Sequence, residues 1–136
     1  MKKLTIIGLL LVIVFAGSML YWRDVRIAKF DPDFRQQLAG VWVRQEADMQ
    51  CTNSVIADGS FAERSWFRHP DRTNTYQRTG TWLVKDGHLI ETIKTSTNPT
   101  EVTPHTNAGR VVHWDESEFV VRWQNSVETI WQRAVH

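Results

Sequence analysis

Apolar and polar residues alternate with a period of two through most of the chain after Gly40. This alternation is typical of β-strands that bury one face, and no stretch in this part repeats apolar residues at helical spacing. The pattern predicts eight strands, over residues 40–46, 51–57, 61–68, 75–84, 88–95, 110–114, 118–124 and 127–133.

Short polar turns separate most of the predicted strands. Asp58-Gly59 and Asp86-Gly87 are pairs that type I′ hairpins prefer, because both central residues need positive φ. Consecutive strands joined by short turns lie antiparallel, which predicts an all-β, up-and-down meander. An eight-stranded meander with one apolar face protects its edges by closing, so we expect a barrel or a half-barrel.

One connection is longer than the others. Residues 95–109 contain Pro99 and Pro104 and almost nothing apolar, so they are not expected to form a buried strand. Long loops of this kind are either mobile or act as lids, and at a barrel rim this one would cover the entrance.

A short helix is predicted before the first strand, over residues 31–40. Asp31 is placed to cap the free N–H groups, Pro32 to occupy the first helical position, and Gly40 to end the helix. Phe34 and Leu38 are four residues apart and share one face. With only these two apolar residues, the helix is expected to cap the β-domain rather than to form its core.

The N-terminus has the length of a membrane span. Residues 4–22 contain no charged side chain and follow Lys2 and Lys3. In a helix these residues cover about 28 Å, close to the roughly 30 Å of hydrocarbon in a bilayer. We favour an uncleaved anchor over a cleaved signal peptide, because the apolar run continues to Tyr21 and Trp22, which suit the membrane interface.

This anchor divides the chain into three parts: the anchor or signal peptide (residues 1–23), a linker with the start of the helix (residues 24–33), and the β-domain (residues 34–136). A very short leader before a single span usually stays inside the cell. The expected location is therefore the cell membrane, single-pass, with the C-terminal domain in the periplasm or outside the cell.

Composition excludes several function classes. The chain has 136 residues, with 16 basic and 15 acidic side chains, so no overall field attracts nucleic acid. Cys51 is the only cysteine, which excludes an intramolecular disulfide and favours a buried thiol. The five histidines lie in separate segments without the spacing of a metal site, and His113 is expected to face the interior beside Val111. No nucleophile motif or phosphate loop is present, so we expect neither an enzyme nor a cofactor.

Glycine stands two positions before tryptophan in both LAGVWVRQ and RTGTWLVK. Glycine marks strand corners and close backbone approaches, and residues two apart share a face. We therefore expect the rings of Trp42 and Trp82 to lie across the spaces left at Gly40 and Gly80. The alternative is coincidence, since the chain has seven tryptophans.

The short helix, the Gly-x-Trp at the start of the first strand and the final WQR resemble the lipocalin and lipocalin-like (calycin-type) families, and residues 56–61 and 79–89 look like their small bacterial members. The resemblance covers roughly residues 34–133. It implies a barrel in which Gly40 and Trp42 close the base and Arg133 packs over the indole ring. Such a cation–π contact contributes about 0.5–2 kcal/mol.

Two functions remain open. The resemblance implies a binding module for a small apolar or amphipathic, lipid-like molecule, with an interior lined by Trp82, Phe119, Val121, Trp123 and Trp131. Alternatively, bulky side chains fill the interior, and the surface residues Arg64, Trp66 and Arg68 bind an envelope protein, so that the domain is an adaptor, inhibitor or assembly factor. An apolar cavity of several hundred Å³ favours the first function, and a filled interior favours the second.

Overall fold

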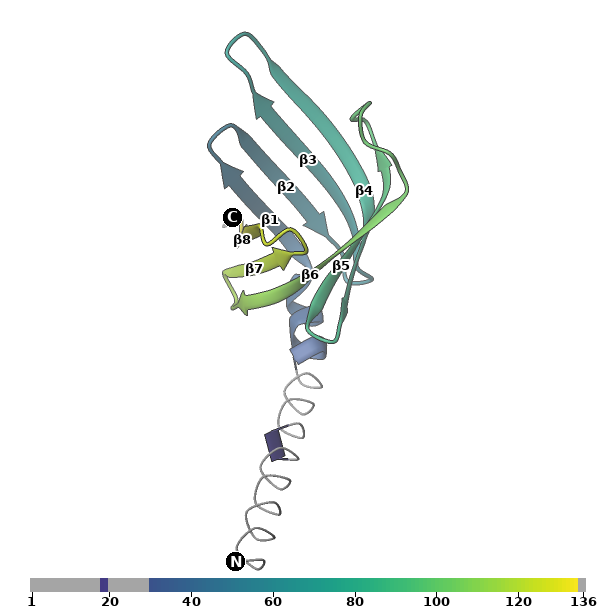
Figure 1. Ribbon diagram of the computed structural model, residues 1–136, viewed down its shortest axis with the longest axis vertical. Coiled ribbons are helices and arrows are strands. Elements are labelled where there is room, and N and C mark those ends of the chain that lie inside the picture. Colours follow the sequence, from purple (N-terminus) through teal and green to yellow (C-terminus); the bar gives the residue numbers. More distant parts are fainter. Residues whose placement is uncertain (1–17, 20–29, 135–136) are drawn as a thin grey trace, which may run out of the picture.

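The computed structural model describes residues 18, 19 and 30–134, in which eight antiparallel strands follow one another around a closed barrel (Figure 1). The strands are β1 (Gly40–Glu46), β2 (Met49–Val55), β3 (Ser60–Arg68), β4 (Thr73–Lys85), β5 (His88–Ser96), β6 (His105–Trp114), β7 (Glu118–Trp123) and β8 (Glu128–Arg133). The predicted all-β meander is confirmed. The barrel is closed rather than half-open, because β1 pairs with β8.

Nearly all of the predicted anchor and linker lies outside the described residues. Within the described part of the chain, no helix has the length and apolar character needed to cross a membrane.

The predicted helix is present, but Asp31 and Gly40 do not have the expected roles. It covers residues 30–38 of the described chain. The Asp31 carboxylate accepts hydrogen bonds from the backbone N–H groups of Asp86 (2.6 Å) and Gly87 (2.9 Å) in the β4–β5 turn, rather than from its own helix. Gly40 does not end the helix; it begins β1 with a φ of 139°, where the chain changes direction.

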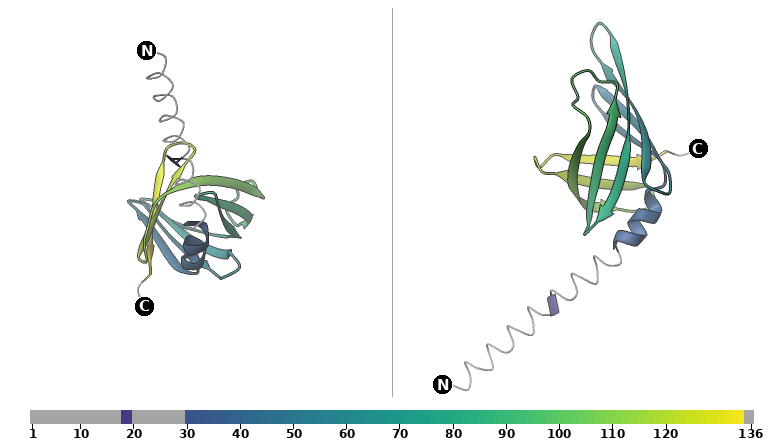
Figure 2. Two further views of the ribbon diagram at one scale, coloured as in Figure 1. Left: turned by 90° about the horizontal axis from the view of Figure 1, so that it is seen from below. Right: turned by 90° about the vertical axis from the view of Figure 1, so that its right-hand side faces the viewer.

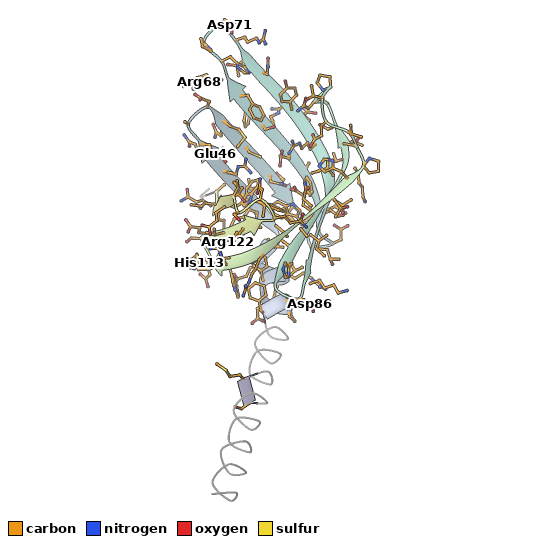
Figure 3. The ribbon with its side chains drawn as sticks, viewed as in Figure 1. Glu46, Arg68, Asp71, Asp86, His113 and Arg122 are labelled. Atoms are coloured by element: carbon orange, nitrogen blue, oxygen red, sulfur yellow. The ribbon has the colours of Figure 1, made fainter. Side chains whose placement is uncertain are left out.

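This helix plugs one end of the barrel, the end at which the β4–β5 turn also lies (Figures 1 and 2). Phe34 and Leu38 are buried beneath it. The Phe34 ring packs edge-on against Phe119, with 5.5 Å between the ring centroids. The figure with side chains places Asp86 beside the helix, and Arg68 and Asp71 at the tip of the β3–β4 hairpin, far from it (Figure 3).

The barrel interior holds an apolar cluster with polar residues beside it. The buried apolar cluster is formed by Phe34, Leu38, Trp42, Cys51, Val55, Phe61, Trp82, Val84, Leu89, Ile93, Phe119, Val121 and Trp131. Four polar residues are also buried in the described chain: Asn53, Glu63, Ser65 and Thr129. Asn53 pairs with Trp42 and with Glu63 across β1 to β3, so the polar residues adjoin the apolar cluster.

β6 differs from the prediction, because it begins at His105 rather than at residue 110. The irregular connection is correspondingly shorter and covers residues 97–104. Residues 105–108 are exposed or half-buried on both faces, so their sequence lacks the alternation that marks a strand. A register shift between Val111 and His113 also leaves His113 exposed rather than facing the interior.

Candidate functional site

Arg133 connects the last strand to the helix and to the first strand. Its guanidinium carbon lies 4.3 Å from the centroid of the Trp42 ring. Its Nη2 and Nη1 atoms donate hydrogen bonds to the carbonyl oxygens of Gln37 (2.5 Å) and Ala39 (3.2 Å). The Trp42 Nε1 donates to the Leu38 carbonyl at 2.8 Å. The carbonyls at the negative end of the helix are thus bound by a cation and an indole, which joins the helix to the barrel seam.

Contrary to expectation, the tryptophan rings do not fill the spaces left at Gly40 and Gly80. The atoms nearest to each glycine belong to residues of other strands. A Cβ atom added at Gly40 would lie 2.6 Å from the Nη1 atom of Arg133. One added at Gly80 would lie 2.0 Å from the carbonyl oxygen of Thr92 and 2.9 Å from the ring of Phe61. Phe61 is the cross-strand partner of Gly80, so a facing ring, not the following tryptophan, occupies this space.

Four of the five residues expected to face a ligand lie in the packed apolar cluster. Trp82, Phe119, Val121 and Trp131 have at most 4% of their surface exposed. The rings contact one another, with centroids 5.5 Å apart for Trp82 and Trp131 and 5.8 Å apart for Trp82 and Phe119. The fifth, Trp123, is partly buried, packs against the edge of this cluster and also lines a mostly polar pocket. The aromatic side chains fill the space in which an apolar ligand was expected.

A pocket of about 390 Å³ opens at the end of the barrel away from the helix. It is lined by Arg44, Glu91, Thr106, Asn107, Ala108, Trp123, Gln124, Asn125, Val127 and Thr129. We call it the mouth pocket. Most of its lining is polar, and its apolar lining residues are Ala108, Trp123 and Val127.

The unequal lengths of the strands create the mouth pocket. β7 and β8 have six residues each, whereas β6 has ten. The pairing of β6 with β7 begins at Gly109, and within the described chain β1 pairs with β8 at Trp42 and Val43 alone. Beyond the β7–β8 turn the barrel wall is therefore incomplete, and the ends of β2 to β6 extend past the short hairpin (Figure 1).

Two charged residues face the mouth pocket from opposite sides. Arg44 lies on β1 and Glu91 on β5, four strands apart around the closed barrel. The Arg44 Nε lies 3.0 Å from a carboxylate oxygen of Glu46, and its guanidinium carbon lies 5.8 Å from the Trp131 ring centroid. The Glu91 carboxylate accepts a hydrogen bond from the Trp82 Nε1 at 3.0 Å. Among the described residues, Glu91 has no ion-pair partner.

A second polar group lies behind this pocket on the inner wall of β2 to β4. Glu63 is bound by the Asn53 amide at 3.5 Å and by the Arg78 guanidinium at 3.4 Å. Burial raises the pKa of the Glu63 carboxyl, and Arg78 partly opposes this rise. Burial and the neighbouring Glu63 also raise the pKa of the Cys51 thiol well above its ordinary range. The expected buried, free thiol is present. The Arg78 guanidinium therefore offsets the charge of the buried Glu63 carboxylate, and Asn53 donates a hydrogen bond to it.

The β5–β6 connection is tied to β4 at the rim. The Arg78 Nε donates to the Glu101 carboxylate at 2.8 Å, and His105 lies 3.6 Å from the same carboxylate. The backbone N–H of Thr97 donates to the Gln77 carbonyl at 2.9 Å. These contacts fasten residues 97–104 to β4 and to the start of β6.

The predicted surface residues lie together on the outer face of β3. Arg64 and Arg68 are exposed, Trp66 between them is half-buried, and neither arginine forms an ion pair with a described residue. A groove of about 480 Å³ runs past Arg64 and Trp66 over the outer faces of β2 to β4. This surface is separate from the mouth pocket, because it lies on the other side of the sheet.

Alternation would have found the polar residues that the sequence analysis missed. Arg44, Glu63 and Glu91 each follow a core residue by two positions, and Arg78 precedes Gly80 by two. Each was therefore placed on the inner face by period alone. Period assigns a face to each residue but does not show that a charged side chain on the inner face belongs to a pocket. Within the described chain, no group of three or more His, Cys, Asp or Glu side chains is arranged to hold a metal ion.

These features define a small, closed, antiparallel β-barrel that is plugged by a helix at one end and polar at the other, consistent with a lipocalin-like barrel. The sequence matches no protein-family model and no curated protein.

Proposed function

We propose that this protein is a lipocalin-like binding module that holds a small amphipathic molecule in the mouth pocket. The N-terminal segment would anchor it in the cell membrane, with the barrel in the periplasm or outside the cell. The observation that carries this proposal is the mouth pocket itself, which combines an aromatic wall with charged and amide groups above a solid core. Its volume of about 390 Å³ lies within the range of small-molecule sites, roughly 300–1,000 Å³.

The proposal moves the ligand from the base of the barrel to its mouth. Because the aromatic cluster is packed, an apolar chain has no room beside Phe119 or Trp131. Trp123 and Val127 offer an apolar surface for one part of the ligand, and the polar lining binds the rest. We propose binding rather than catalysis, because the buried carboxylate of Glu63 is already engaged by Asn53 and Arg78.

A second candidate function rests on the outer groove. Trp66 is half-buried between two arginines that have no ion-pair partner among the described residues, and tryptophan and arginine are among the residues enriched at protein-binding hot spots. In this alternative the domain is an adaptor, inhibitor or assembly factor for an envelope protein, and the mouth pocket is empty space at the rim.

Native mass spectrometry of the full-length protein, extracted from membranes in mild detergent, separates the two functions. Val127→Trp would fill the mouth pocket, and Ile130→Trp is a matched control, because the two side chains are 51% and 50% exposed and only Val127 lines the pocket. We expect a co-purified small molecule that is lost in Val127→Trp and retained in Ile130→Trp. A bound protein that is lost in Trp66→Ala, with no small molecule present, would instead support the adaptor.

A further inference from the structure

The mouth pocket contains a carboxylate without a cation to balance it. Glu91 is half-buried, and its one polar side-chain contact in the described chain is the hydrogen bond from Trp82. That bond holds the carboxylate in place but does not neutralise its charge. A partly buried charge is costly unless it is paired, so this position favours a ligand that brings a positive group.

The opposite wall carries the complementary feature. The guanidinium of Arg44 has five N–H donors. Its Nε faces Glu46, whose side chain is 54% exposed, and its Nη2 contacts the Met49 sulfur, a weak acceptor, at 3.6 Å. Solvent screens the ion pair with Glu46, and donors remain for an oxyanion at the pocket wall.

Arg44 and Glu91 do not pair with each other, although both line the same pocket. They stand on β1 and β5, opposite strands of the barrel, so the pocket has a positive side and a negative side. A neutral ligand leaves Glu91 without a cation and leaves Arg44 with only its solvent-screened pair to Glu46. A ligand with one charge is attracted by one wall and repelled by the other, which makes the opposite charges a specificity device.

Trp123 adds to the recognition of a cation. Its indole N–H is already donated to the Thr129 hydroxyl at 3.0 Å, so the part that it offers to a ligand is its ring. Tryptophan is the best aromatic partner for an organic cation, in particular a quaternary ammonium. The amides and hydroxyls of the remaining wall suit the polar atoms between the two charged groups.

We propose that the mouth pocket takes a zwitterion, a small molecule with an ammonium group placed toward Glu91 and Trp123 and an acidic oxygen group placed toward Arg44. This inference rests on the proposed function, because it names the ligand class of the same pocket. The zwitterion has two possible sources, a free solute and the headgroup of a lipid, and they share this chemistry.

Isothermal titration calorimetry with the full-length protein in detergent tests the proposal. The probes are phosphocholine, glycine betaine and glycine, and the single-charge controls are choline, acetate and inorganic phosphate. We expect at least one zwitterion to bind about tenfold more tightly than either of its single-charge counterparts. The proposal is overturned if no zwitterion binds more tightly than those counterparts.

Variants of Glu91 and Arg44 test the proposal through the preference for zwitterion, anion or cation. A purely structural role of these residues would not change that preference. Glu91→Gln should weaken zwitterion binding and strengthen phosphate binding, because it removes the repulsion but keeps an acceptor for Trp82. Arg44→Gln should do the reverse and favour choline. Glu128→Gln, an exposed change in the Arg122 ion pair, is the control and should alter neither. Unchanged preferences in the two pocket variants would also overturn the proposal.

The source of the zwitterion and the status of the proposed function are separated by two further arms. Vesicles of phosphatidylcholine, but not of phosphatidylglycerol, should compete with the free probe if the ligand is a lipid headgroup; no competition indicates a free solute. If native mass spectrometry finds a neutral or singly charged molecule that Val127→Trp displaces, the pocket binds ligands but the zwitterion proposal fails. If nothing binds in either experiment, both proposals fail.

Discussion

Replacing Arg133 with alanine is expected to lower the free energy of unfolding by about 2.5–4 kcal/mol. The cation–π contact with Trp42, at 4.3 Å, contributes about 1 kcal/mol in a partly buried setting. The guanidinium also donates to the carbonyls of Gln37, Ala39 and Glu116. Each of these charge-assisted bonds contributes roughly 0.5–1 kcal/mol after allowance for partial exposure. Their loss frees the end of the helix from the barrel seam.

Urea unfolding of the full-length protein, followed by tryptophan fluorescence and far-ultraviolet circular dichroism at neutral pH, measures this change. Arg122→Ala is the matched control, because Arg122 also makes two short bonds, to Glu128, but its side chain is 54% exposed. We expect that control to cost at most about 1 kcal/mol. Arg133→Lys keeps the charge but loses the planar fork, so it should recover less than half of the loss. If Arg133→Ala costs no more than Arg122→Ala, the role assigned to this residue is wrong.

Three further changes test the packing and the buried polar groups. Gly80→Ala should cost about 3 kcal/mol, because its Cβ would lie 2.0 Å from a backbone oxygen, whereas Gly87→Ala, with a φ of 74° and open space around it, should cost only about 1 kcal/mol; equal losses in thermal unfolding would contradict the packing argument. Burial raises the folded-state pKa of Glu63 above its ordinary 4.5, so the unfolded chain loses this proton first and the wild type loses stability as pH rises. Glu63→Gln should therefore gain stability relative to the wild type as the pH rises above about 4.5, and a pH-independent difference between their unfolding free energies would refute this. Because burial raises the pKa of the Cys51 thiol, it should resist a thiol reagent such as Ellman's at pH 8 until denaturant unfolds the barrel; rapid labelling of the native protein would show that the thiol is accessible.

Local patterns were sufficient for the architecture. Alternation gave the strand number and the inward faces, and Asp-Gly pairs marked two of the turns; Asp86 and Gly87 do have the positive φ that such a turn requires. These features are local because a strand with one buried face must alternate, whatever it pairs with. The sequence did not predict the start of β6, because residues 105–108 are exposed or half-buried on both faces of the strand. Without a buried face their sequence does not alternate.

Two residues at the helix have roles that their neighbours in the sequence do not predict. A cap for its own N–H groups was the reasonable local role for Asp31, but its carboxylate binds the β4–β5 turn, more than fifty residues away in sequence. Gly40 was expected to end the helix, but instead it begins β1 and makes room for Arg133. Both residues serve contacts that exist only once the helix is packed against the barrel.

The sequence by itself determined an antiparallel meander with an apolar inner face and a helix to cover one end. Only the tertiary structure decided that the aromatic residues fill the base, that the short β7–β8 hairpin leaves the mouth open, and that Arg44 and Glu91 line one pocket from opposite strands. The physical reason is that period and turn chemistry depend on neighbours along the chain, whereas the volume left inside a barrel and the charges across it depend on strands that meet only when the sheet closes.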